Sequence, residues 1–254
     1  MAGKVTLTRL EYDVLWEHLR LGPYRPVIAV ASPGATERER AELRAKAWAS
    51  LAAKNLGDAD SVDDWLAHQL TRLARPEWEI DARLQLAEQG PRTFALVSRA
   101  GRGVTIAVLA DDLTLRVTKW GEEVTAAARL LPAHPAGTGN SISLPVAALD
   151  RAAARAGSDR DRFRRALVSD GLGKAEARKI TAVLGDAIRL GHFGAARTPA
   201  DGVRRRASHV VSVYDDPAGR YLFTRKKNWV TLLPGTEQAI ARQLGELLTE
   251  LGRT

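Results

Sequence analysis

The chain shows one succession of sequence patterns twice, and this repetition restricts the fold more than any other feature. Segments with apolar residues three and four positions apart come first, as in amphipathic helices. Residues 77–131 then alternate apolar and polar positions through four strand-like segments and end in a helical pattern. Residues 189–251 show the same order after a second set of helical segments.

This order predicts an α+β fold. We expect two pseudo-duplicated halves, related by a quasi-two-fold axis, that together form a central antiparallel β-sheet flanked by helical bundles. The halves are predicted as residues 1–135 and 141–254, packed as one globular domain, with the Gly/Pro-rich stretch 133–140 as the linker. A repeat of this length exceeds that of solenoid units.

Several local signals mark where elements begin. Thr8-x-x-Glu11 and Thr36-x-x-Glu39 each predict a helix that opens with a capping box. Ser61-x-x-Asp64 predicts the start of a third helix, which Pro76 closes. The short apolar run Val27–Ala31 is compatible with a strand.

Composition and charge narrow the class of protein. No apolar run reaches the roughly 20 residues of a membrane-spanning helix. Charged residues interrupt the N-terminal segment, which therefore lacks a signal-peptide pattern, and we expect a cytoplasmic protein. The net charge of +8 is unevenly distributed: residues 1–150 hold 18 Lys/Arg and 19 Asp/Glu, whereas residues 151–254 hold 20 and 11. Such an excess can attract an acidic partner or a phosphate backbone.

No motif in the sequence predicts catalysis. The chain has no cysteine, no G-x-S-x-G and no H-E-x-x-H motif. The stretch Gly171–Lys174 lacks the spacing of a phosphate loop and favours a turn between helices. His192 and His209 could face each other across neighbouring strands, but no third zinc ligand is evident. We therefore predict no enzyme activity, no metal and no cofactor, although an unrecognised hydrolase stays open.

The stretch "GRYLFTRKKNW", residues 219–229, interleaves aromatic and basic side chains. It allows three interpretations: an ordinary strand, turn and strand with lysines at the turn, a protein interface, or a nucleic-acid platform of stacking aromatics and cations. The candidate partner-binding region comprises residues 208–233 and 159–188. Within it the candidate partner-binding residues are Tyr221, Phe223, Arg225 and Trp229.

Three passages together resemble one family. The opening "LTRLEYDVLWEHLRLGPYRPV", the middle passage with "LLPAHPAGTGNSISLP" and the close "GRYLFTRKKNWVTLLPGTEQAIARQLGELL" resemble, in order, the EspG proteins associated with ESX (type VII) secretion in actinobacteria. The likeness covers nearly the whole chain. It rests on patterns and not on an invariant chemical motif, so no contact residue is transferred from the family.

The resemblance implies a cytosolic, non-enzymatic specificity chaperone. Such a chaperone would bind PE–PPE-type helical heterodimers at the tip of the PPE subunit, shield that apolar tip and keep the substrate soluble for export. No cofactor, membrane insertion or nucleic acid is expected, and exposed apolar sheet could favour a homodimer. The alternative function is a nucleic-acid-binding module that uses the basic C-terminal surface.

Overall fold

The computed structural model describes residues 3–253. We use the term first repeat for residues 4–128, which contain β1 (Lys4–Leu7), α1 (Arg9–His18), the 3-10 helix η1 (Pro26–Ile28), α2 (Glu37–Ala53), α3 (Asp64–Ala74), β2 (Trp78–Gln85), β3 (Arg92–Ala100), β4 (Gly103–Leu109), β5 (Leu113–Thr118) and α4 (Glu123–Ala128). The second repeat, residues 142–252, contains β6 (Ile142–Pro145), α5 (Val146–Ala156), α6 (Arg160–Ser169), α7 (Lys174–Gly185), β7 (Arg189–Arg197), β8 (Arg205–Arg206), β9 (Val211–Asp216), β10 (Gly219–Lys226), β11 (Trp229–Pro234) and α8 (Glu237–Gly252).

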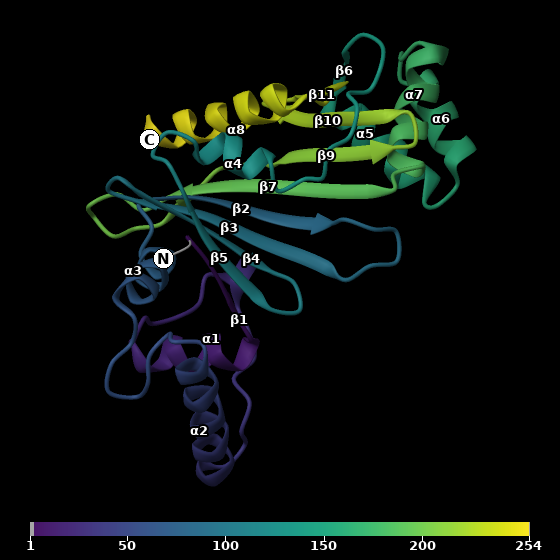
Figure 1. Ribbon diagram of the computed structural model, residues 1–254. Helices are drawn as coiled ribbons and strands as arrows, with labels where there is room; N and C mark the ends of the chain where they lie inside the picture. The colour runs from purple at the N-terminus through teal and green to yellow at the C-terminus, as the bar shows by residue number, and fades with distance from the viewer. Residues whose placement is uncertain (1–2, 254) are drawn as a thin grey trace.

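Within the described residues, the eleven strands form one antiparallel sheet. Figure 1 labels its strands from β1 at one edge to β6 at the other. The order across the sheet is β1-β5-β4-β3-β2-β7-β9-β10-β11-β6, and β8 pairs with β7. β2 and β7 pair along their full length at the centre, from Trp78 opposite Arg197 to Gln85 opposite Leu190. The same order of strands runs outward on both sides of this pair, which confirms the predicted duplication. The predicted boundaries, 135 and 141, lie in the loop between α4 and β6.

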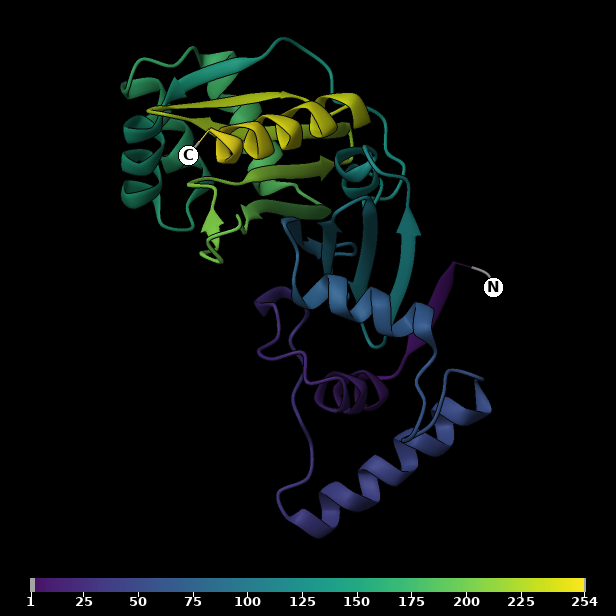
Figure 2. The same cartoon turned by 90° about the vertical axis from the view of Figure 1, so that its left-hand side faces the viewer.

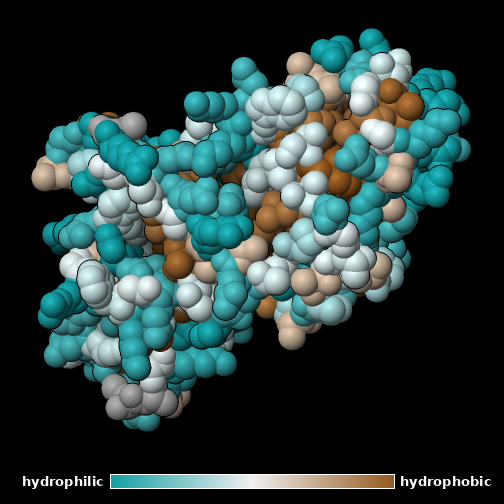
Figure 3. Space-filling model, turned by 90° about the horizontal axis from the view of Figure 1, so that it is seen from above, coloured by the Kyte–Doolittle hydropathy of each residue, from teal (hydrophilic) through white to brown (hydrophobic). Residues whose placement is uncertain are grey.

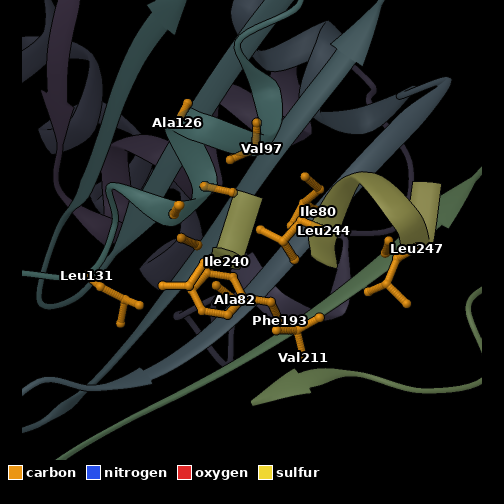
Figure 4. Packing of buried hydrophobic residues seen from close by; sticks show 14 of the residues in the cluster. Ile80, Ala82, Val97, Ala126, Leu131, Phe193, Val211, Ile240, Leu244 and Leu247 are labelled. Atoms are coloured by element: carbon orange, nitrogen blue, oxygen red, sulfur yellow. The ribbon is translucent and has the colours of Figure 1, made fainter. Parts of the chain in front are cut away.

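One face of the sheet is covered by α4 and α8, the helices that end the two repeats. Apolar side chains from β2, β7 and β9 meet Ile240, Leu244 and Leu247 of α8 in a buried cluster. Figure 4 shows Phe193 at the middle of this cluster, beside Ala82 and Leu131. Because residues from both repeats fill one core, this cluster joins the repeats.

The opposite face carries two separate helical groups, one at each end of the sheet. In the first repeat, α1, η1 and α3 pack on β3, β4 and β5 around a second buried cluster. In the second repeat, α5, α6 and α7 pack beside β9, β10 and β11 around a third cluster. Figure 2 shows the two groups at opposite ends of the molecule.

Most predicted helix starts agree with the structure, and two local predictions need correction. Both capping boxes are present, at Thr8 and at Thr36. The third helix is capped by Asp63, whose carboxylate accepts from the Leu66 amide, and not by Ser61. Residues Val27–Ala31 do not form a strand: they include most of η1, because Pro26 opens a 3-10 turn that places Val27 in the core. The sequence prediction also omitted the short strands β1 and β8.

Candidate functional site

The sheet face between the two helical groups carries a row of four side chains, which we name the central strip. It consists of Arg83, His192, Ser212 and Phe223, which lie opposite one another on β2, β7, β9 and β10. The side chain of Arg83 is 50% exposed, His192 and Phe223 are half-buried, and Ser212 is buried. The strip is therefore the part of this face that a partner can reach between the helices.

An apolar pocket opens where the central strip meets the second helical group. Its volume is about 390 Å³. The rings of Phe223 and Tyr214 form its sheet side, in an edge-to-face contact with centroids 6.2 Å apart. Each helix of the group adds an apolar side chain to the lining, namely Leu149 of α5, Phe163 of α6 and Leu184 of α7. This pocket can accept apolar side chains of a partner.

The structure divides the four predicted contact residues between two faces of the sheet. Tyr221, Phe223 and Arg225 alternate on the face of the apolar pocket. Trp229 lies opposite Lys226 in the sheet, and Lys226 forms an ion pair with Glu246 of α8. Trp229, which is 53% exposed, therefore belongs to the α8 face, so the four residues do not form one contact surface.

Tyr221 is buried and holds the linker between the repeats. Its hydroxyl accepts a hydrogen bond from the Thr138 amide at 3.0 Å and another from the Lys179 ammonium. Gly137 lies so close to the ring that an added Cβ would meet Tyr221 Cζ at 2.0 Å, so only glycine fits there. A partner can therefore touch Phe223 and Arg225 directly, whereas Tyr221 acts on the surface only through the loop that it supports.

The basic residues of the same stretch do not form a continuous cationic stripe. The Arg225 guanidinium lies 3.8 Å from the carboxylate of Asp150, a residue that also lines the apolar pocket. Lys226 points to the opposite face, and Lys227 occupies the hairpin turn with a φ of 53°. With Tyr221 buried and Trp229 on the other face, the stacking platform that nucleic-acid binding would need is not assembled.

At its other end, the central strip meets a cluster of arginines around two buried carboxylates on β2. Arg206 binds Asp81 through two hydrogen bonds of 2.6 and 3.0 Å, and Arg204 binds Glu79. The Arg25 guanidinium lies 3.5 Å from Glu79. These pairs line a cleft of about 220 Å³ and tie η1 and the β7–β9 connection to the centre of the sheet.

His192 and Ser212 form the one pair on the strip with acid–base potential. His192 Nδ1 lies 2.9 Å from Ser212 Oγ. Burial, and to a lesser degree the positive charge of Arg83, lowers the pKa of His192. Among the described residues no carboxylate contacts the imidazole to orient it as in a catalytic triad. His192 faces Ser212 and not His209, and the described residues contain no cluster of three metal-ligating side chains, so the suggested zinc pair is wrong.

The predicted binding region, residues 208–233 and 159–188, contains the pocket residues Tyr214, Phe163 and Leu184 but not Leu149 of α5, and none of the four was singled out as a contact residue. Tyr214 and His192 pair with Tyr221 and Ser212 in the sheet register, so strand parity places all of them on one face. The alternation of side chains along the strands is the sequence signal that could have identified this shared face. Which part of the face the helices leave uncovered depends on helix docking, which no local pattern encodes.

The chain thus has an α+β fold in which an apolar pocket and charged groups lie on one sheet face, between two helical groups. A family model described as the EspG family matches residues 8–246, and the chain belongs to this family. The solved structure of the Mycobacterium tuberculosis type VII secretion system chaperone EspG5, in complex with a PE25–PPE41 dimer, superposes with a TM-score of 0.79. It is 16% identical in sequence, and the match covers 96% of this chain and 95% of that one.

Two further findings complete the comparison. No curated protein sequence matches the chain. No helix among residues 3–253 combines the length and the apolar character that crossing a bilayer requires.

Proposed function

We propose that this protein is a cytoplasmic, non-enzymatic specificity chaperone of type VII secretion that binds PE–PPE-type helical heterodimers. The observation that carries the proposal is the apolar pocket beside the central strip, in a chain that belongs to the EspG family. The EspG5 structure of the same fold holds a PE–PPE dimer, which supports the same class of partner here.

The apolar pocket suits the tip of a helical bundle. A large apolar side chain that leaves water contributes about 1.5–3 kcal/mol, so a few side chains from the tip would supply much of the binding free energy. Phe223 and Tyr214 remain partly accessible and would stack against them. Covering such a tip would also prevent aggregation of the substrate before export.

The surrounding charges would orient the substrate. Arg83 lies on the strip and Arg225 near the pocket, and both are about half exposed. Partly exposed charges contribute modestly to affinity but select a matching partner surface. We assign direct contact to Phe223 and Arg225 and a supporting role to Tyr221. Trp229 would touch the substrate only if the substrate reaches around the β10–β11 hairpin.

Co-expression with each PE–PPE pair of the same genome tests the proposal. We expect one soluble complex that elutes as a single peak in size-exclusion chromatography. Phe223→Asp should weaken it at least tenfold, because an uncompensated carboxylate would enter the apolar pocket. Val117→Asp, at a residue of β5 that is 42% exposed, is the matched control and should leave binding unchanged. No complex with any pair, or equal loss in both variants, would contradict the proposal.

The same pocket could hold a second copy of the chain when no substrate is present. We propose a weak, concentration-dependent homodimer, because an apolar surface open to water favours self-association. Light scattering should show dimer in the free protein and its replacement by the substrate complex. A dimer that persists with substrate bound would place the contact elsewhere.

A further inference from the structure

A second pocket, distinct from the apolar one, lies between α6 and α7. Its volume is about 340 Å³, and it shares no lining residue with the apolar pocket. Four of its lining residues are cations and none is a carboxylate, the set being Arg164, Arg165, Val168, Lys174 and Arg178. In Figure 3 the right-hand rim of the molecule, where Figure 1 places α6 and α7, is strongly hydrophilic. We name this feature the cationic pocket.

Most of the positively charged side chains in the cationic pocket have no partner within the part of the chain that the structure describes. Arg164 lies 3.0 Å from the carboxylate of Asp161. The side chains of Arg165, Lys174 and Arg178 form no hydrogen bond and no ion pair with any residue that the structure describes. Arg165 contributes only at a distance, as one of the weaker causes of the lowered pKa of Asp159.

The unpaired cations of the cationic pocket destabilise the folded state. Lys174 occupies the first turn of α7, where the helix dipole favours negative and not positive charge. Lys174 and Arg178 are four residues apart on one helix face, and like charges at that spacing repel. Concentrated like charge of this kind destabilises the compact state and is relieved when a counter-charge arrives from outside.

The arginines of α2, in the first repeat, show the opposite arrangement. Arg38 pairs with Glu42, Arg40 with Asp13 and Glu17, and Arg44 with Glu17. A helix rich in arginine can therefore be neutralised within this fold, whereas three of the four cations of the cationic pocket have no carboxylate partner among the described residues.

We propose that the cationic pocket binds a carboxylate-rich segment of a protein partner. Guanidinium groups match carboxylates in paired hydrogen bonds, which favours acidic side chains as the ligand. The lining holds no aromatic ring on which a base could stack, and a single compact pocket is too short to follow a nucleic-acid backbone. The site adds a second contact for whichever protein occupies the apolar pocket, and its test needs no knowledge of that protein.

The test uses a fluorescein-labelled deca-glutamate peptide and the full chain, with fluorescence anisotropy at about 50 mM salt. Arg165→Gln with Arg178→Gln should weaken peptide binding about tenfold and flatten its dependence on salt. Lys46→Gln with Arg102→Gln is the matched control, since it removes two exposed positive charges from the first repeat. That control should stay within twofold of the unmodified protein.

Other outcomes would overturn the assignment. Equal weakening in both double variants would mean that net charge and not the pocket attracts the peptide, and absence of peptide binding would refute the site. A 12-nucleotide single strand that binds tenfold more tightly than the peptide, with the same dependence on Arg165 and Arg178, would assign the pocket to nucleic acid. The melting temperature of the pocket variant should not fall, and a clear decrease would assign the cations a structural role instead.

Discussion

The two repeats build the same strands and helices but close them differently. In the first repeat, the rings of Tyr12, Trp16 and Tyr24 pack against one another with centroids 4.9–5.4 Å apart, and Tyr12 is fully buried. In the second repeat, Phe223 and Tyr214 form a similar ring contact but line an open pocket of about 390 Å³. One helical group thus serves mainly to complete a core, whereas the other leaves apolar surface for a partner.

The charges follow the same division. The arginines of α2 are paired with carboxylates, whereas Arg165, Lys174 and Arg178 of α6 and α7 have no carboxylate partner among residues 3–253. The duplicated fold thus has one helical group whose α2 arginines are neutralised and another that holds an open apolar pocket and unpaired cations. The unpaired cations contribute to the excess of positive charge after residue 150.

The largest expected effect compares one aromatic residue from each repeat. Tyr12→Ala should lower the free energy of unfolding by about 3–5 kcal/mol, because it empties a closed core. Phe223→Ala should cost about 1 kcal/mol, because part of its ring already faces water. Urea unfolding followed by circular dichroism measures both values. Equal losses of unfolding free energy would show that the second repeat is packed as tightly as the first, and would contradict the proposed difference between the repeats.

The next effect concerns the ion pair that fixes the linker to the second repeat. Arg220 binds Asp215 at 2.6 Å and donates to the Pro132 carbonyl at 2.7 Å, and both charged side chains are buried. Arg220→Ala should cost about 3 kcal/mol in urea unfolding, since Asp215 would stay buried with only Arg189 nearby. Arg129→Ala, which breaks an exposed pair with Glu237, should cost less than about 1 kcal/mol. A similar cost for both would mean that the linker is not held by this pair.

A smaller effect depends on pH and on the central strip. Because the pKa of His192 lies below its ordinary value of 6.5 in the folded chain, the unfolded chain takes up the proton first as the pH falls. The stability contributed at this position is therefore present above about pH 6.5 and is lost below it. His192→Gln should reduce the loss of stability between pH 7.5 and 5.5, as measured by urea unfolding at both values. An unchanged slope would show that the imidazole titrates as freely as in water.

The smallest effect tests the hairpin turn. Lys227 has a φ of 53°, a conformation that favours glycine, so Lys227→Gly should leave stability unchanged or raise it by about 0.5 kcal/mol. Asn228→Gly is the control, because Asn228 has no such φ and should lose about 0.5 kcal/mol. Thermal unfolding of both variants measures the difference. A loss at Lys227 as large as that at Asn228 would show that the turn is not strained.

Much of the fold could be predicted because local signals agreed with the global order. Two capping boxes, the change of period at residue 77 and its recurrence at residue 189 locate most elements. β1 escaped prediction because its four residues are too few to show a period. Residues 27–31 were misassigned because a short apolar run does not distinguish a strand from a buried 3-10 turn.

The candidate site was less accessible to sequence reasoning. Strand alternation places Tyr221 and Phe223 on one face, but only the tertiary structure shows that linker residue Gly137 covers the first ring and leaves the second exposed to the pocket. Likewise, Trp229 looks like an interface residue in the sequence, and its face depends on the register of β10 with β11. Docking of loops and helices decides these outcomes, and it is not encoded in any local pattern.

Hydrogen–deuterium exchange of the protein, free and bound to its PE–PPE partner, tests the central claim most directly. We expect slower exchange on binding in β9, β10 and the helices α5–α7, with little change in α1–α3. We also expect no protection of α8, which covers the opposite face of the sheet. Protection confined to α1–α3, or to the α8 face, would contradict the assignment of the second repeat as the binding half.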